Sequence, residues 1–290
     1  MQDKRNPKPK REILRLIDST KKGILGGAGA QLSTTGFQLD SGQNLRIPAF
    51  PGWSGRIWAR TGCTFDESGI GTCLTGDCGG RLQCDGIGAA PPVSLFEITL
   101  GTGDQMDFYD VSMVDGYNLP LVASPQTAVS GGCNATGCVA NINMGCPKEL
   151  QVVGGDGGEE GGVVACKSAC EAFGLDQYCC AGEFANPTTC RPSFYSSIFK
   201  RACPRAYSYA FDDGTSTFTC KANEYAIVFC PNMAAGMKRL SGAAPPPPIF
   251  REQRSHGEIA DMVASSNNIL SPIPAVISIL LVVLASSLFF

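Results

Sequence analysis

Four cysteines, Cys63, Cys73, Cys78 and Cys84, lie close together, and thiols can cross-link, bind metal or act as nucleophiles. The glycines between them permit the tight turns that closely spaced cross-links need. Zinc sites favour C-x-x-C pairs, often with histidine, whereas the spacings here are ten, five and six and the single histidine of the chain is His256. The pattern therefore predicts disulfides rather than a metal site.

The composition of the chain also indicates a protein that disulfides stabilise. Its 290 residues include 15 Cys, 35 Gly and 19 Pro, and 17% are charged, which favours short strands and turns over long surface helices. Disulfides persist in oxidising compartments, so we expect a protein of the secretory route. The formal net charge of −3 argues against nucleic acid as a partner, and the sequence indicates no cofactor.

Short alternations of apolar and polar residues predict the strands that would position a site. In RIWAR, the side chains of Arg56, Trp58 and Arg60 would share one face of a strand. Turn residues separate this stretch from three others: VSLFEITLG (93–101), MDFYDVSMV (106–114) and EYAIVFC (224–230). Several short strands between turns indicate an antiparallel sandwich or barrel.

A second cross-linked region contains seven cysteines, from Cys146 to Cys203. Apolar spacing predicts a short helix in VVACKSACEAFG that includes Val164 and Cys166 and ends at Gly174. A second helix is predicted in PSFYSSIFKRACP, with three apolar side chains turned inward: Phe194, Ile198 and Phe199. A subdomain of this size cannot be held together by core burial alone, so the disulfides must contribute.

The stretch GIGTCLTGDCGGRLQC (69–84) carries a resemblance to a known family. Its Thr75-Gly76-Asp77-Cys78 and the cysteine that follows resemble the signature of thaumatin-like proteins, a plant family related to defence. The match covers residues 23–231 and includes GRIWARTGCTFD, DFYDVSMVDGYNLP, CPKELQVV, QYCC, CPRAYSYAFDDGTSTFTC and YAIVFCP. It implies an all-β fold, a thaumatin-like antiparallel β-sandwich core with two smaller disulfide-rich subdomains, one a loop region at about 63–90 and one helical at about 139–203.

The family's cysteine pairing, carried over in order, implies seven disulfides: Cys63–Cys73, Cys78–Cys84, Cys133–Cys220, Cys138–Cys203, Cys146–Cys166, Cys170–Cys179 and Cys180–Cys190. Sequence alone does not choose this connectivity. The pairing leaves Cys230 outside the seven, because the matching cysteine in the family bonds to one in a first strand that we do not find here.

Residues 1–22 resemble neither a secretory signal peptide nor the start of the family's domain. Arg15 and Asp18 interrupt the apolar residues, so the uninterrupted apolar core of a signal peptide is missing. We therefore expect an atypical leader, disordered or misassigned, before a domain at 23–231. A genuine cytosolic variant is the alternative.

Four carboxylates, taken singly, would each be an ordinary solvated strand or turn residue: Glu97, Asp110, Asp115 and Asp212. The resemblance implies that they line a cleft together with Arg56, because thaumatin-like proteins with antifungal character place one arginine and four acids at these positions. Carboxylates are strong acceptors for hydroxyl groups, so such a cleft suits β-1,3-glucan or another wall polysaccharide.

Hydrolysis of a glucan would need one protonated carboxylic acid and one carboxylate, and some family members hydrolyse glucans weakly. We expect Glu97 as the acid and Asp110 as the base. Aromatic rings near these acids would stack on sugar rings or fill the core: Phe96, Phe108, Tyr109 and Tyr117. The matched region contains no Ser/His/Asp or Cys/His set for nucleophilic catalysis, since His256 lies outside it.

After Pro231 the sequence changes character. Residues 232–273 read as a proline-rich polar linker and residues 274–290 as a hydrophobic tail. Small residues, a short spacer and the apolar tail predict a GPI-anchor signal cleaved near Ser265 or Ser266, with a transmembrane tail as the alternative. Asn134-Ala135-Thr136 is a glycosylation sequon that is usable only in the secretory route.

Three functions are compatible with these observations. The first is an antifungal plant-defence protein that binds β-1,3-glucan, extracellular at the cell surface or wall, membrane-anchored and monomeric. The second is a weak endo-β-1,3-glucanase. The third is a cell-surface module that binds another protein and has no glucan activity.

Overall fold

The computed structural model describes residues 12–18, 22–29, 32–130, 132–154 and 161–231. Within these ranges ten strands form one hydrogen-bonded network. They are β1 (Glu12–Asp18), β2 (Lys22–Gly29), β3 (Gly36–Asp40), β4 (Asn44–Ala49), β5 (Ser54–Arg60), β8 (Leu95–Thr99), β9 (Asp107–Ser112), β10 (Leu121–Ser130), β11 (Thr136–Cys138) and β14 (Phe218–Phe229).

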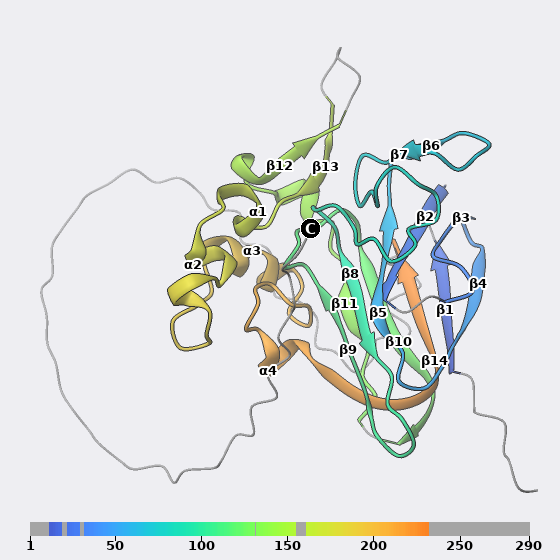
Figure 1. The fold of residues 1–290 in the computed structure, drawn as a ribbon. Coiled ribbons are helices and arrows are strands. Elements are labelled where there is room, and N and C mark those ends of the chain that lie inside the picture. The colour runs from blue at the N-terminus through green and yellow to red at the C-terminus, as the bar shows by residue number, and fades with distance from the viewer. Residues whose placement is uncertain (1–11, 19–21, 30–31, 131, 155–160, 232–290) are drawn as a thin grey trace, which may run out of the picture. The chain divides into compact units, whose positions relative to one another are not determined.

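The network consists of two sheets that share β14. One sheet has the order β3-β2-β5-β8-β9-β14, and the other joins β14 to β10 and β11 on one side and to β1 and β4 on the other. The first residues of β14, Phe218–Cys220, pair with β9, and the residues from Lys221 to Phe229 pair with β10. Every pairing is antiparallel except that of β1 with β14. In Figure 1 the orange β14 curves from one sheet into the other.

The inner faces of the two sheets form one hydrophobic core. Ile57, Phe96 and Val111 of the first sheet lie in the same buried cluster as Leu121 and Ile227 of the second. Side chains alternate between the two faces of each strand. Every second residue therefore points into this core, and the residues between them form an outer face. The antiparallel sandwich that the sequence predicts is therefore confirmed.

Residues 12–18 form a strand, although the sequence led us to expect that residues 1–22 lie outside the domain. The strand β1 runs parallel to Glu224–Phe229 of β14 and antiparallel to β4. Apolar residues dominate EILRLID, and both β14 and β4 offer backbone groups that need partners along this edge. The charges of Arg15 and Asp18 are compatible with this strand.

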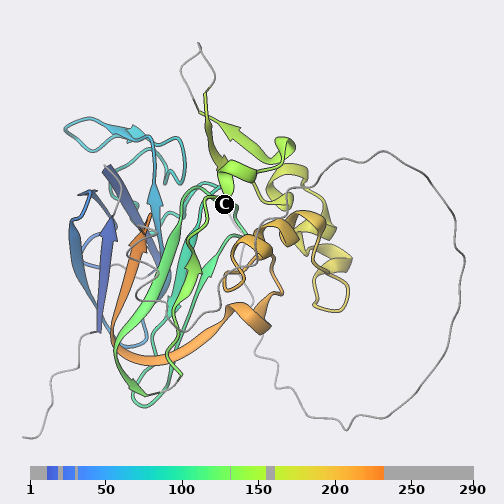
Figure 2. The ribbon, with the colours of Figure 1, turned by 180° about the vertical axis from the view of Figure 1, so that it is seen from behind.

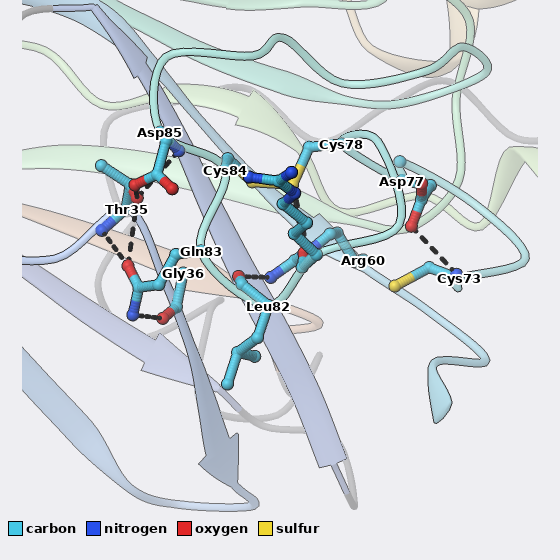
Figure 3. Close-up of a disulfide and its surroundings, with 12 residues drawn as sticks. Thr35, Gly36, Arg60, Cys73, Asp77, Cys78, Leu82, Gln83, Cys84 and Asp85 are labelled. Atoms are coloured by element: carbon cyan, nitrogen blue, oxygen red, sulfur yellow. Dashed lines mark hydrogen bonds between the residues drawn. A yellow bond between two sulfur atoms is a disulfide. The ribbon is translucent and has the colours of Figure 1, made fainter. Parts of the chain in front are cut away.

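The loop region is a small sheet of β6 (Thr64–Phe65) and β7 (Gly71–Thr72), closed by two disulfides, and it covers one end of β5. Trp58 Nε1 donates to Gly76 O at 2.8 Å, and the Arg60 guanidinium donates to Arg81 O at 2.7 Å and to Leu82 O at 2.5 Å. Figure 3 shows Arg60 beside the Cys78–Cys84 disulfide. Burial lowers the pKa of Arg60 to about 10, which leaves it charged at neutral pH.

The helical subdomain contains the sheet β12 (Gln151–Val153) with β13 (Val163–Cys166), and several short helices. These are η1 (Ile142–Gly145), η2 (Lys148–Leu150), α1 (Ala169–Phe173), α2 (Asp176–Cys179), η3 (Gly182–Phe184) and α3 (Phe194–Ala202), followed by α4 (Asp213–Ser216) before β14. Helices α1 to α4 lie on one side of the sandwich in both views (Figures 1 and 2).

Two local predictions for this subdomain are wrong in part. Val164 and Cys166 belong to the strand β13, because this segment pairs with β12 and bridges to Tyr117, so only the part after Ser168 is helical. Gly174 ends α1 in the left-handed conformation, as predicted. In α3 Phe199 is buried as predicted, whereas Phe194, in the first turn, is 70% exposed.

Seven disulfides occur among the described residues, and they join the same pairs that the resemblance implies: Cys63–Cys73, Cys78–Cys84, Cys133–Cys220, Cys138–Cys203, Cys146–Cys166, Cys170–Cys179 and Cys180–Cys190. Two of them, Cys133–Cys220 and Cys138–Cys203, connect distant segments of the chain. Disulfides of this kind stabilise small subdomains chiefly by restricting the unfolded chain.

The predicted linker at 232–273 and the tail at 274–290, with Ser265 and Ser266, lie outside the described residues. Among the residues that the structure does describe, no helix has the length and hydrophobicity needed to cross a membrane.

We predict that Arg60→Met lowers the free energy of unfolding by about 2–4 kcal/mol, because the buried carbonyl groups of Arg81 and Leu82 would lose a charged donor. Urea unfolding with the disulfides intact measures the change. Arg81→Met is the matched control, since its own side chain is exposed and should matter by less than about 0.5 kcal/mol. Equal effects of the two substitutions would contradict the structural role of the Arg60 guanidinium.

Candidate functional site

Three ionisable residues form a row across the outer face of the first sheet. Arg56 of β5 is opposite Glu97 of β8, and Glu97 is opposite Asp110 of β9. Directly opposed residues of antiparallel strands have Cβ atoms about 4.5–5.5 Å apart and point to the same side. The three side chains that the resemblance brings together are therefore neighbours in the structure.

Arg56 forms the exposed, cationic end of this row. Arg56 Nε lies 2.5 Å from Glu97 Oε1, and the side chain of Arg56 is 54% exposed. Further along β5 the loop region covers Trp58 and Arg60, which share the outer face with Arg56. The open part of this face thus begins at Arg56, and the Arg56–Glu97 ion pair lies at its edge.

The row forms the floor of a groove with a volume of about 260 Å³. The turn after β9 and the segment that leads into α4 supply the other walls. The lining residues are Arg56, Leu95, Glu97, Asp110, Ser112, Val114, Asp115, Tyr207, Ala210 and Asp213. Four of these ten side chains are carboxylic acids, and Arg56 is the single cation among them.

Asp110 has the most perturbed carboxyl group of the row. Its Oδ1 atom is buried and has no hydrogen-bond partner among the residues that the structure describes. Burial, and then the charge of Glu97, raise the pKa of Asp110 to about 8, while Arg56 opposes the shift. With this pKa Asp110 carries its proton at pH 7 and can donate a hydrogen bond, whereas Glu97 forms an ion pair with Arg56.

The structure does not bring Asp212 into the groove, and the adjacent Asp213 lines it instead. Asp212 Oδ2 accepts from the backbone nitrogen of Ser208 at 3.0 Å and lies 2.9 Å from Lys200 Nζ. Asp213 is exposed, and its Oδ1 accepts from the Tyr207 hydroxyl at 2.7 Å. These contacts turn the Asp212 carboxylate toward Ser208 and Lys200, whereas Asp213 lines the groove.

Asp115 lines the groove as expected, and α1 brings a further acid, Glu171, close to it. Burial raises the pKa of Glu171 to about 7, Asp115 adds to this shift, and Lys167 opposes it. Sequence reasoning missed both Glu171 and Tyr207. Nothing local in the sequence indicates that α1 and the segment before α4 approach the end of β9.

The aromatic residues that were candidates for sugar stacking mostly fill the core. Phe96, Tyr109 and Tyr117 are buried, and the Tyr109 and Tyr117 hydroxyls donate to backbone carbonyl groups. Phe108 is 53% exposed and shares the outer face of β9 with Asp110. The aromatic residue that lines the groove is Tyr207.

No cluster of three or more potential metal ligands occurs in the described part of the chain. Within the same residues the fourteen cysteines of the sandwich and its subdomains are oxidised in disulfides, and the groove contains no thiol. The groove residues offer carboxyl, guanidinium and hydroxyl groups, which can make hydrogen bonds and transfer protons.

Comparison with known proteins adds the following. A sequence model described as the Thaumatin family matches residues 18–231. Pathogenesis-related protein 5 of Arabidopsis thaliana is 54% identical over 209 residues, which cover 72% of this chain and 84% of that protein. The PR5-like receptor kinase of the same plant is 47% identical over 213 residues, which cover 72% of this chain and 32% of the kinase.

Among solved structures, the crystal structure of a laminaripentaose-producing β-1,3-glucanase in complex with laminaritetraose is similar in fold. The alignment covers 77% of this chain and 99% of the glucanase chain, with a TM-score of 0.53 and 12% sequence identity. At this identity the likeness concerns the fold alone.

We predict that Asp110→Asn flattens the pH dependence of stability. The folded protein keeps the Asp110 proton up to about pH 8, whereas the unfolded chain loses it above about pH 4, so this group lowers the free energy of unfolding as pH rises between these values. The slope from this group is at most about 1.4 kcal/mol per pH unit.

Melting temperatures measured between about pH 4.5 and 8.5 test this prediction. The range covers the interval between the pKa of Asp110 in the unfolded chain and its pKa in the folded protein. The exposed Asp104 offers a matched control, and Asp104→Asn should keep the wild-type slope. If Asp110→Asn has the same slope as wild type, Asp110 is not a neutral acid in the folded protein.

Proposed function

The chain belongs to the thaumatin family, and on this premise we propose that its acidic groove binds β-1,3-glucan, or another neutral wall polysaccharide, in plant defence. The observation that supports the proposal is the row Arg56–Glu97–Asp110, in which a cation, a carboxylate and a neutral acid lie side by side on an open sheet face.

The groove offers both kinds of hydrogen-bonding group that sugar hydroxyls need. Arg56 and protonated Asp110 donate, and the carboxylates of Glu97, Asp115 and Asp213 accept. A hydroxyl group donates and accepts at the same time, so a neutral polysaccharide can use such an alternating set. A highly anionic polymer would be repelled by the acids that dominate the lining.

Hydrolysis of the bound glucan is the second proposal, and in it the two carboxyl groups exchange the roles expected from the sequence. Asp110 carries the raised pKa and would act as the acid, and Glu97, paired with Arg56, would act as the carboxylate. Directly opposed strand residues have Cβ atoms about 4.5–5.5 Å apart, so the two side chains start close together on the sheet. The proposal therefore favours the short carboxyl separation of retaining glycosidases, about 5–5.5 Å, over the longer one of inverting enzymes.

Recognition of another protein is the remaining candidate. One relative that shares 47% identity with this chain is a PR5-like receptor kinase, in which the matched part makes up 32% of the protein. A domain of this kind in a receptor is consistent with a role in ligand recognition outside the cell. In this case the groove would receive a partner protein and the polysaccharide would not bind.

An extracellular location agrees with the seven disulfides, because they persist in oxidising compartments. Attachment to the membrane through the C-terminal tail stays a prediction. Glycosylation at Asn134 is a further proposal: the side chain of Asn134 is exposed, while the Thr136 hydroxyl donates to Arg205 O at 2.6 Å and is buried.

We predict that Glu97→Gln weakens retention on insoluble β-1,3-glucan about tenfold, because a charged acceptor and its ion pair with Arg56 are lost. Asp110→Asn should change retention by less than about threefold, since an amide still donates a hydrogen bond. Release of reducing ends should fall to background in Asp110→Asn if the protein hydrolyses the glucan, because an amide has no acidic proton to transfer.

Glu67→Gln is the matched control for the binding assay, because Glu67 is exposed in the loop region and does not line the groove. If the wild-type protein is not retained, or if Glu97→Gln and Glu67→Gln behave alike, the groove is not a glucan site, and recognition of a protein becomes the better proposal.

We also predict that the chain, passed through the secretory route of a eukaryotic cell, carries an N-glycan at Asn134. The exposed amide is accessible to transfer of the glycan. Intact mass before and after treatment with an N-glycosidase, compared between wild type and Asn134→Gln, measures the modification. An unchanged mass in the wild type would refute it.

A further inference from the structure

Lys200 of α3 makes three polar contacts with the segment that forms one wall of the groove. Its Nζ atom lies 2.9 Å from Asp212 Oδ2, 2.8 Å from Ser216 Oγ and 3.2 Å from Ala206 O. The side chains of Lys200 and Asp212 are 26% and 12% exposed. The pair is thus largely shielded from water, where an ion pair is worth more than on an open surface.

The residues that Lys200 contacts bracket the groove wall. Ala206 immediately precedes Tyr207, Asp212 immediately precedes Asp213, and Ser216 ends α4. Tyr207 and Asp213 line the groove and are joined by the hydrogen bond from the Tyr207 hydroxyl to Asp213. A single ammonium group therefore contacts residues on both sides of the two groove residues that come from this segment.

The chemistry of the contact suits lysine in particular. An ammonium group has three donors on one nitrogen atom, and here three acceptors converge on it. The planar fork of arginine spreads its donors over a wider area and fits acceptors that lie in one plane. A methionine in place of Lys200 would leave the Asp212 carboxylate without its cation in a shielded position.

We propose that Lys200 is a positioning residue for polysaccharide binding. Through Asp212 and Ser216 it holds Asp213 and Tyr207 in place, so that the helical subdomain sets the shape of a groove whose floor belongs to the sandwich. Asp212 then helps Lys200 to hold this wall of the groove and does not itself contact the ligand. This inference rests on the proposed function, since it assigns how one wall of the proposed glucan site is held.

A double-mutant cycle between Lys200 and Asp213 tests the assignment, with retention on insoluble β-1,3-glucan as the measurement. Lys200→Met should weaken retention about tenfold, the effect of one lost charge-assisted hydrogen bond. In the Asp213→Asn background the same substitution should weaken it by less than about threefold, because the group that Lys200 positions is already impaired. Lys148→Met, an exposed lysine of the same subdomain, is the control and should leave retention unchanged.

Two equal and independent losses in the cycle would overturn the proposal, since Lys200 would then act without Asp213. If Lys200→Met does not fold, Ser216→Ala removes one of the three contacts and is tested in the same cycle, with a smaller but still non-additive effect expected.

Hydrogen exchange tests the role of Lys200 without relying on glucan binding, so the inference and the proposed function can fail separately. In Lys200→Met the backbone amides of residues 206–217 should exchange faster, while the amides of β5, β8 and β9 keep their wild-type rates. If the wild-type protein does not bind glucan but this local change occurs, the proposed function fails and the positioning of Asp213 stands. If exchange at residues 206–217 is unchanged, or increases across the whole domain, Lys200 does not position the groove wall.

Discussion

Strand register is the constraint on which the groove depends. Arg56, Glu97 and Asp110 are neighbours because β5, β8 and β9 are aligned without a bulge between them. A slip of one residue in any strand would turn its charged residue into the core and an apolar residue outward. The buried Phe96 and Tyr109, which lie next to Glu97 and Asp110 in the chain, oppose such a slip. The strand register that packs the apolar residues into the core therefore also aligns the three residues of the site.

The sheet supplies only the floor of the groove, and cross-linked segments supply its surroundings. The helices near the groove have between four and nine residues, which is too short for stability on their own. Disulfides replace the missing core burial, and Cys138–Cys203 ties the end of α3 directly to the strand β11. The loop region covers Trp58 and Arg60 at one end of β5. The open part of the outer face of this strand therefore begins at Arg56.

Much of this architecture could be predicted from the sequence, because alternating strands, turn residues and the order of the cysteines are local or family-wide signals. The failures have a different origin. Asp212 and Asp213 are adjacent and chemically identical, and contacts from distant residues distinguish them: Lys200 pairs with Asp212, while Asp213 lines the groove. The protonation of Asp110 depends on burial, which no local pattern reports. Glu171 of α1 lies close enough to Asp115 for their charges to interact, although the two residues are far apart in the sequence.

The strand β14 has a consequence for the way in which the chain reaches this structure. It belongs to both sheets and is the last strand of the domain, and it pairs with β1 from the start of the chain. The sandwich cannot close until β14 has been synthesised, because this strand belongs to both sheets. Contacts between residues so distant in the chain make folding slow, and strands that wait for their partners have open edges that can pair with other chains. Protection from aggregation until β14 has paired is therefore the requirement that this topology imposes.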